Sequence, residues 1–245
     1  MLARGSFVIA TLAFHATVLP LSARAQTDYV PSAVTPVPAS SSLISRQTAM
    51  IAGFLFAGAL MADPEVREET QEQRTAATNS IAMAGNSFGT WSILIPALSA
   101  TYLAGQVAGS GEIKGTVLRA GAAAALATAV TTGLKYTVGR SRPDVGGGNF
   151  EFRPFSGAAS FPSGHTAAAF AIATAVADQT HDGWSDYVLY GAASLTAISR
   201  INDNRHWASD VLIGGLVGHL SAKWIGRKMG PVQVAPTGVS VNLKF

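Results

Sequence analysis

The sequence predicts an all-α protein, a bundle of about six core helices with a possible short C-terminal β-hairpin. Apolar segments of similar character recur along the chain, and short polar connections separate them. Alternation of apolar and polar residues, the pattern of a strand, is confined to residues 232–245. A chain of 245 residues is long enough for one domain with a well-filled core, or for two small ones.

The composition excludes several classes of protein and site. Cysteine is absent, so neither disulfides nor thiolate metal sites can form. The formal net charge is only +3 and is spread through the chain, which argues against a nucleic-acid-binding surface. Small anionic ligands remain compatible with this charge.

The N-terminus has the pattern of a secretory signal peptide at residues 1–25. Arg4 precedes an apolar stretch over residues 7–21, and small residues surround the expected cleavage point after Ala25. An uncleaved membrane anchor is the alternative, although the apolar stretch is short for a membrane span. The mature protein is therefore expected to be exported.

The rest of the chain divides into a linker, a helical domain and a tail. Residues 26–47 are rich in Pro, Ser and Thr and predict a linker, residues 48–230 form the helical domain, and residues 231–245 form a tail or a hairpin with Gly238 in its turn. Residues 63–80 begin with Asp-Pro and are densely charged, which predicts a solvated amphipathic helix. The apolar helices are expected at Thr48–Ala62, Trp91–Val107, Thr116–Leu134, Thr166–Ala177, Tyr187–Ile198 and Val211–Ile225.

These helices fit either a membrane protein or a soluble periplasmic one. Several segments are shorter than the roughly 20 residues that a membrane span requires. Arg119 and Lys223 also interrupt two of them. The mean hydropathy of +0.29 is high for a soluble chain of this size and favours the membrane.

Three short motifs carry chemically active side chains in a fixed order. They are "KYTVGRSRP", "PSGH" and "SRINDNRHWASD". Each alone has a structural explanation: cations at a helix end, a helix cap, and a surface pair at i,i+4 spacing. The residues that the motifs supply are Lys135, Arg142, Ser163, Gly164, His165, Arg200, His206 and Asp210.

Taken together, the three motifs can form one site for a phosphate dianion. Arg side chains bind phosphate oxygens in bidentate fashion, and Lys acts as a point charge. Gly164 lets the backbone approach a ligand, and the N–H groups that open the following helix point at an anion there. Asp210, one helical turn after His206, can orient that imidazole and leave its second nitrogen as a nucleophile, while His165 is free to protonate the departing oxygen.

This ordered set resembles the type 2 phosphatidic acid phosphatase superfamily, which also includes the class A acid phosphatases and the vanadium haloperoxidases. The family pattern is Lys, six residues, Arg-Pro; then Pro-Ser-Gly-His; then Ser-Arg, five residues, His, three residues, Asp. Every specified position is present in this chain. The resemblance implies a phosphohistidine on His206, a general acid at His165, and neither a metal nor another cofactor.

The resemblance further implies a phosphatase for phosphomonoesters or diphosphates, with an active site at the membrane that faces the periplasm. Candidate substrates are phosphatidic acid, phosphatidylglycerophosphate, undecaprenyl diphosphate and the lipid A phosphates. A soluble periplasmic acid phosphatase acting on small phosphomonoesters is the alternative. A vanadium haloperoxidase is disfavoured, because members of that branch are usually much larger.

The segment "DVGGGNFEFRPFSGAAS", between the first two motifs, combines glycines with three phenylalanines. A mobile flap that meets an acyl or prenyl chain and a disordered connector are both open interpretations. Arg153 could extend the anionic site, although no motif position supports it. His181 and His219 match no motif and are expected to be ordinary loop and helix residues.

Overall fold

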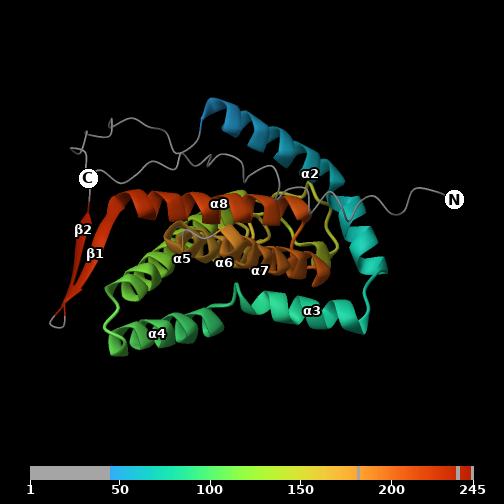
Figure 1. The fold of residues 1–245 in the computed structure, drawn as a ribbon. Coiled ribbons are helices and arrows are strands. Elements are labelled where there is room, and N and C mark those ends of the chain that lie inside the picture. The colour runs from blue at the N-terminus through green and yellow to red at the C-terminus, as the bar shows by residue number, and fades with distance from the viewer. Residues whose placement is uncertain (1–44, 181–182, 236–237, 244–245) are drawn as a thin grey trace. The chain divides into compact units, whose positions relative to one another are not determined.

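The computed structural model describes residues 45–180, 183–235 and 238–243. The predicted signal peptide and nearly all of the predicted linker lie outside these residues. The predicted all-α class is confirmed, with helices in the described part of the chain and one small hairpin near its end (Figure 1). The elements are α2 Arg46–Glu72, α3 Ala76–Ser87, α4 Trp91–Val107, α5 Gly111–Val138, the 3-10 turn η2 Pro143–Val145, α6 Gly164–Thr180, α7 Gly183–Asn202, α8 Ala208–Lys228, β1 Met229–Ala235 and β2 Gly238–Leu243.

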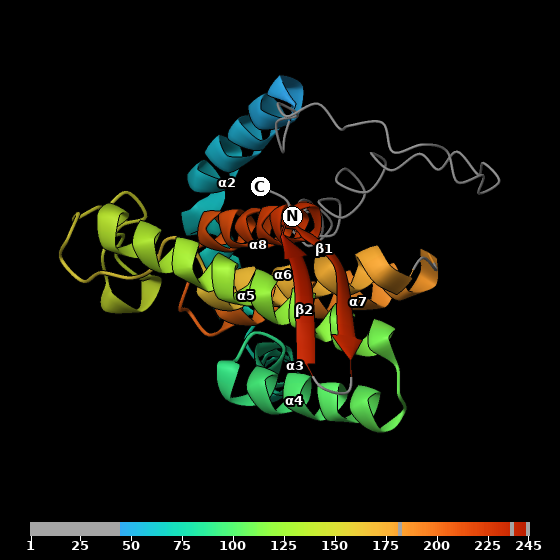
Figure 2. The same cartoon turned by 90° about the vertical axis from the view of Figure 1, so that its left-hand side faces the viewer.

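Helix α6 lies at the centre, and α5, α7 and α8 pack around it (Figure 2). Its buried face consists mostly of alanine, which allows close contact between helix backbones. The backbones of α6 and α8 are in close contact, because a Cβ atom at Gly218 would overlap the carbonyl oxygen of Ala167. Small residues on both helices therefore fix the separation of α6 and α8.

The predicted helix boundary at Asp63 and Pro64 is wrong. Helix α2 runs through Pro64 to Glu72, and α3 begins separately after a capping box at Thr75. A proline inside a helix leaves the carbonyl four residues earlier without its usual donor. Here the carbonyl of Leu60 accepts from the Nδ2 atom of Asn149 at 2.8 Å instead, so the helix continues.

Helix α5 ends where Gly139 takes a left-handed conformation with φ of 60°. A Cβ atom at this position would overlap the carbonyl oxygen of Arg153, so only glycine fits. The chain then leaves the helix axis, and Arg140 and Arg142 follow in the loop rather than on the helix. Because of this turn, Arg142 lies in the loop and Lys135 on α5, and both are at the same end of the bundle.

The C-terminal strands form an antiparallel hairpin, as the alternating pattern predicts. Val232 pairs with Val241 and Ala235 pairs with Gly238. Gly238 therefore begins β2 beside the turn, and residues 236–237 of the turn lie outside the described residues.

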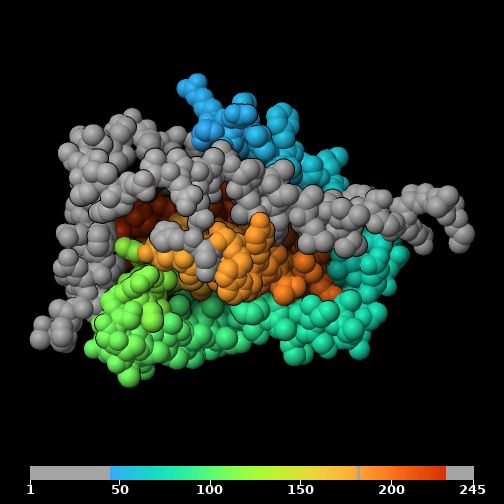
Figure 3. Space-filling model, in the orientation of Figure 1, coloured from blue at the N-terminus to red at the C-terminus, as the bar shows by residue number. Residues whose placement is uncertain are grey.

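Two of the described helices, α2 and α5, are long and apolar enough to cross a membrane. Helices α3 and α4 meet that test only as a pair bent by 53°. Many large apolar side chains on α2, α3 and α4 are exposed, and Figure 3 shows α3 and α4 at the surface of one face. The exposed residues of these helices are Met50, Ile51, Phe54, Leu55, Met61, Ile81, Met83, Ile93, Ile95, Leu103 and Val107.

Candidate active site

The three predicted phosphate-binding cations lie around His165 at one end of the bundle. The charges of Arg200, Lys135 and Arg142 all act on the His165 imidazole. They come from the end of α7, the end of α5 and the loop after α5, while His165 lies in the first turn of α6. Segments far apart in the sequence therefore converge on one cationic site.

Two guanidinium groups of this site have N–H donors without a hydrogen-bond partner among the described residues. The Nε atoms of Arg142 and Arg200 are buried and have no hydrogen-bond partner among the described residues. Arg200 is held in place by its Nη1 atom, which donates to Asn86 Oδ1 at 2.7 Å. Buried donors of this kind are costly unless an acceptor fills the site, so both arginines are poised for an anion.

Lys135 and Gly164 define the floor of the site. The Nζ atom of Lys135 donates to the carbonyl oxygen of Ala159 at 2.6 Å, which fixes the ammonium group beside the loop that leads into α6. A Cβ atom at Gly164 would lie 3.9 Å from Cε of Lys135, so the backbone that opens α6 is close to the cation. The unpaired N–H groups of the first turn add to the positive potential there.

Ser163 connects the start of α6 to the start of α8. Its side chain is fully buried and its hydroxyl accepts from Thr166 Oγ1 at 3.0 Å. Its N–H donates to the backbone carbonyl of Asp210 at 3.0 Å. The segments that carry His165 and His206 are therefore joined directly.

His206 and Asp210 are neighbours, but not as one turn of a single helix. His206 lies in the loop before α8, and Asp210 lies in the first turn of α8. The distance between His206 Nδ1 and Asp210 Oδ2 is 3.5 Å, an ion-pair distance longer than an ordinary hydrogen bond. Because Nδ1 faces the carboxylate, Nε2 is the ring nitrogen that Asp210 does not engage.

The electrostatics of the site keep both histidines neutral near pH 7. Burial lowers the pKa of His206 to about 4, although Asp210 opposes the shift. Burial and the charges of Arg200, Lys135 and Arg142 lower the pKa of His165 to about 4. Burial alone would raise the pKa of Asp210, but His206 and Arg140 bring it below its ordinary value, so this residue is a carboxylate.

Sequence reasoning missed two residues beneath the site, Asp63 and Arg140. Both are fully buried, and the Arg140 guanidinium forms ion pairs with the carboxylates of Asp63 and Asp210. The expectation that residues 63–80 are solvated is wrong at Asp63. Arg140 occupies an unspecified position inside the first motif, so the motif gave no signal for it.

The loop between the first two motifs is held to the end of α5. The Arg153 N–H donates to the carbonyl of Gly139 at 2.8 Å, and the Phe155 N–H donates to that of Tyr136 at 2.9 Å. The Phe155 ring also contacts the Tyr136 ring edge-on, with centroids 5.1 Å apart. These contacts do not fit the disordered connector.

Arg153 and the remaining histidines stand apart from the site. The Arg153 side chain is 66% exposed and pairs with Glu151, so it does not extend the anionic site. His219 lies on α8 within 3.2 Å of Thr174 Oγ1, an ordinary helix contact. His181 lies outside the described residues.

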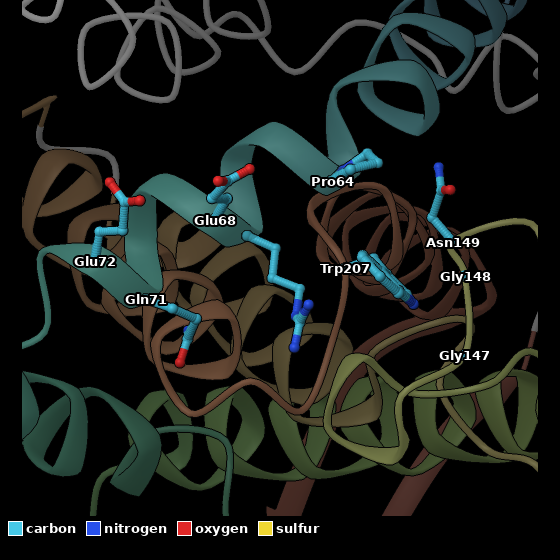
Figure 4. A pocket seen from close by; sticks show the side chains of 9 residues that line it. Pro64, Glu68, Gln71, Glu72, Gly147, Gly148, Asn149 and Trp207 are labelled. Carbon is cyan, nitrogen blue, oxygen red and sulfur yellow. The ribbon is translucent and has the colours of Figure 1, made fainter.

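A hollow of about 580 Å³ lies between α2, the loop at residues 147–149 and Trp207 (Figure 4). Its α2 wall carries Arg67, Glu68 and Glu72, which are mixed in charge. None of the predicted phosphate-binding or catalytic residues lines it. The hollow is therefore distinct from the cationic site.

Comparison with known proteins supports these observations. The PAP2 superfamily model matches residues 116–231. The chain is 42% identical over 114 residues to a lipid A 1-phosphatase from Porphyromonas gingivalis, and the match covers 44% of this chain and 23% of that protein. The chain thus spans about a quarter of that relative.

Two solved structures share the fold at low sequence identity. LpxE from Aquifex aeolicus has a TM-score of 0.55 and 22% identity, covering 67% of this chain and 94% of that one. A transmembrane PAP2 type phosphatidylglycerolphosphate phosphatase from Bacillus subtilis has a TM-score of 0.53 and 20% identity, covering 72% and 92%. Both likenesses concern the arrangement of the helices.

Proposed function

Because residues 116–231 of the chain belong to the PAP2 superfamily, we propose that the protein is a phosphatase that hydrolyses phosphate esters or diphosphates of membrane lipids without a metal. One observation carries the proposal: the Nε donors of Arg142 and Arg200 are buried and unpartnered in a site that also holds a neutral His206. An anion with several acceptor oxygens satisfies these donors, and a phosphate group is such an anion.

In the first step, Nε2 of His206 attacks the phosphorus atom. A P–N bond forms, the P–O bond to the lipid breaks, and the leaving oxygen takes a proton from His165. Asp210 stabilises the positive charge that develops on the His206 ring. Lys135, Arg142 and Arg200, with the N–H groups at Gly164, hold the charge of the phosphoryl oxygens.

In the second step, water attacks the phosphohistidine. His165 accepts a proton from the water, the P–N bond breaks, and inorganic phosphate is released with both histidines restored. The low pKa of His165 in the free site results from burial and from three nearby cations. A bound phosphate dianion offsets these cations, so substrate binding itself raises the pKa of His165 and supplies the general acid.

The exposed apolar side chains of the protein and the substrates of its relatives both favour a lipid substrate. Helices α2 and α5 are long enough to span a membrane, and the exposed apolar side chains of α2, α3 and α4 suit contact with lipid. The relatives named for a substrate act on lipid A or phosphatidylglycerolphosphate. On the expectation that residues 1–25 are an export signal, we place the active site on the periplasmic side.

The test is release of inorganic phosphate by the purified protein in detergent. We expect activity on phosphorylated lipids such as lipid A and phosphatidic acid that exceeds activity on a soluble phosphomonoester. Vanadate should inhibit, and EDTA should not. The variant His206→Ala should be folded and inactive.

Each contrary result has a definite meaning. Retained turnover in His206→Ala would refute the nucleophile, and loss of activity with EDTA would refute the metal-free reaction. Release of active protein by osmotic shock alone, with preference for small phosphomonoesters, would favour the soluble acid phosphatase. Peroxide-dependent bromide oxidation by a vanadate-loaded sample would favour the haloperoxidase.

A further inference from the structure

A carboxylate on α2 is buried against the segment that carries His206. Asp63 is the buried side chain of α2, with 0% of its surface exposed. Its Oδ1 atom accepts the N–H of Ser209 at 2.8 Å, and its Oδ2 atom accepts the Ser209 hydroxyl at 2.6 Å. Ser209 lies in the first turn of α8, where backbone N–H groups have no partner within the helix. Asp63 therefore caps, from a distant helix, the first turn that follows His206.

Arg140 connects Asp63 to Asp210. Its Nη2 atom donates to Asp63 Oδ2 at 2.6 Å, and its Nη1 atom donates to Asp210 Oδ1 at 2.5 Å. Further bonds to the Asn149 carbonyl and the Ser209 hydroxyl use the remaining N–H groups. All five guanidinium donors are thus satisfied inside the protein.

The surroundings of Arg140 keep it from moving toward a substrate. The guanidinium carbon lies 5.5 Å from the ring centroids of both Phe152 and Trp207. This arrangement contrasts with Arg142 and Arg200, whose Nε atoms are unpartnered among the described residues. Arg140 consequently has a different task from the phosphate-binding cations, although it lies in the same motif as Arg142.

We infer that Asp63 and Arg140 are positioning residues that hold Asp210, and through it His206, in the geometry needed for attack on phosphorus. Arg140 engages Oδ1 of Asp210, whereas Oδ2 accepts the Trp207 N–H at 3.0 Å and the Ser160 hydroxyl and lies 3.5 Å from Nδ1 of His206. These contacts fix the carboxylate plane, so that Oδ2 is the oxygen beside the imidazole. Asp63 in turn fixes both the guanidinium and the first turn of α8. The inference rests on the proposed function, since it takes His206 as the nucleophile.

The first test is Asp63→Asn, which keeps the shape of the side chain but removes its charge. The amide can still accept the Ser209 N–H, but its Nδ2 atom then meets the Arg140 Nη2 donor. A misplacement of about 1 Å at a reacting group costs about 10²-fold in rate. We expect kcat for phosphate release to fall between about 10-fold and 10²-fold with KM within about twofold, because no phosphate-binding side chain changes.

The matched control is Glu65→Gln, an exposed carboxylate two residues further along α2. It should leave kcat, KM and the unfolding transition as in the unmodified protein. A second variant, Arg140→Lys, keeps the buried charge but has three donors on one atom in place of the five donors of the planar guanidinium, so it cannot hold both carboxylates in the same positions. It should lower kcat in the same way, with each rate normalised to the folded fraction of the sample.

The outcomes separate this inference from the proposed function. Wild-type kcat in folded Asp63→Asn or Arg140→Lys, beside an inactive His206→Ala, overturns the inference and leaves the proposed function intact. Losses that match only the unfolded fraction also overturn it, because they indicate a purely structural role. An active His206→Ala overturns both.

Discussion

Replacing Gly214 by alanine tests how closely the packing of α8 against α6 controls the site. Gly214 lies four residues after Asp210 on α8, and a Cβ atom built there would be 2.5 Å from the carbonyl oxygen of Ser163. Ordinary contact begins at about 3.4 Å, so the two backbones must separate by nearly 1 Å. Ser163 directly precedes Gly164 and His165, and the displacement therefore falls on the proposed phosphate site.

The cost of Gly214→Ala can be worked out in two parts. Overpacking of a well-packed contact costs about 1 to 3 kcal/mol in the free energy of unfolding. A shift of about 1 Å at a catalytic group costs about 10²-fold in kcat/KM. The measurements are unfolding in detergent followed by circular dichroism, and phosphate release from a phosphorylated lipid.

The matched control for this substitution is Gly226→Ala on the same helix. No atom lies within 4 Å of a Cβ built at Gly226, so the methyl group meets open space. Alanine is better than glycine inside a helix by up to about 1 kcal/mol, and this variant should be at least as stable as the unmodified protein. Normal activity in a folded Gly214→Ala sample would refute the idea that the α6–α8 contact sets the site geometry.

Two further predictions concern charge at the site. Arg142→Ala should lower kcat/KM by about 10²-fold to 10³-fold in phosphate-release assays, because it removes a preorganised donor. Arg153→Ala, on the exposed loop, should leave kcat/KM unchanged. Equal losses in both variants would refute the assignment of Arg142 as a phosphate-binding residue. Because the pKa of both His165 and His206 is about 4 in the folded protein and 6.5 ordinarily, the unfolded chain binds more protons between these values. The free energy of unfolding should therefore fall as the pH falls from about 6.5 to 4. In denaturant titrations, His206→Asn should weaken this pH dependence. An unfolding transition that does not respond to pH in this window would contradict the conclusion that the two histidines are buried and neutral.

The sequence was most informative where local pattern and chemistry coincide. The three motifs predicted which cations lie near His165, because the order and spacing of their residues can be read from the sequence without knowing how the helices pack. The limits of α4 also agree with the apolar segment Trp91–Val107, since Thr90 precedes it and a turn with Gly109 at a φ of 66° follows it. The hairpin was predictable because strand alternation appears in one stretch of the chain.

Long-range polar contacts were not predictable in this way. Asp63 stands before a proline in a charged segment, the usual pattern of a solvated helix start. Its buried carboxylate is paired with Arg140, which is 77 residues away in sequence, and the Leu60 carbonyl that Pro64 leaves without a helix donor is satisfied by a side chain from another loop. Such partners become visible only when α2 is placed against the start of α8.

The phosphorylated intermediate is the most direct test of the central claim. The protein is mixed with a phosphorylated lipid, quenched rapidly in alkaline denaturant to preserve phosphohistidine, digested with trypsin, and examined by mass spectrometry. The account predicts a phosphate on the peptide that begins at His206, after cleavage at Arg205, and no such species in His206→Ala. Phosphate on another residue, or turnover by His206→Ala with no phosphorylated peptide, would contradict it.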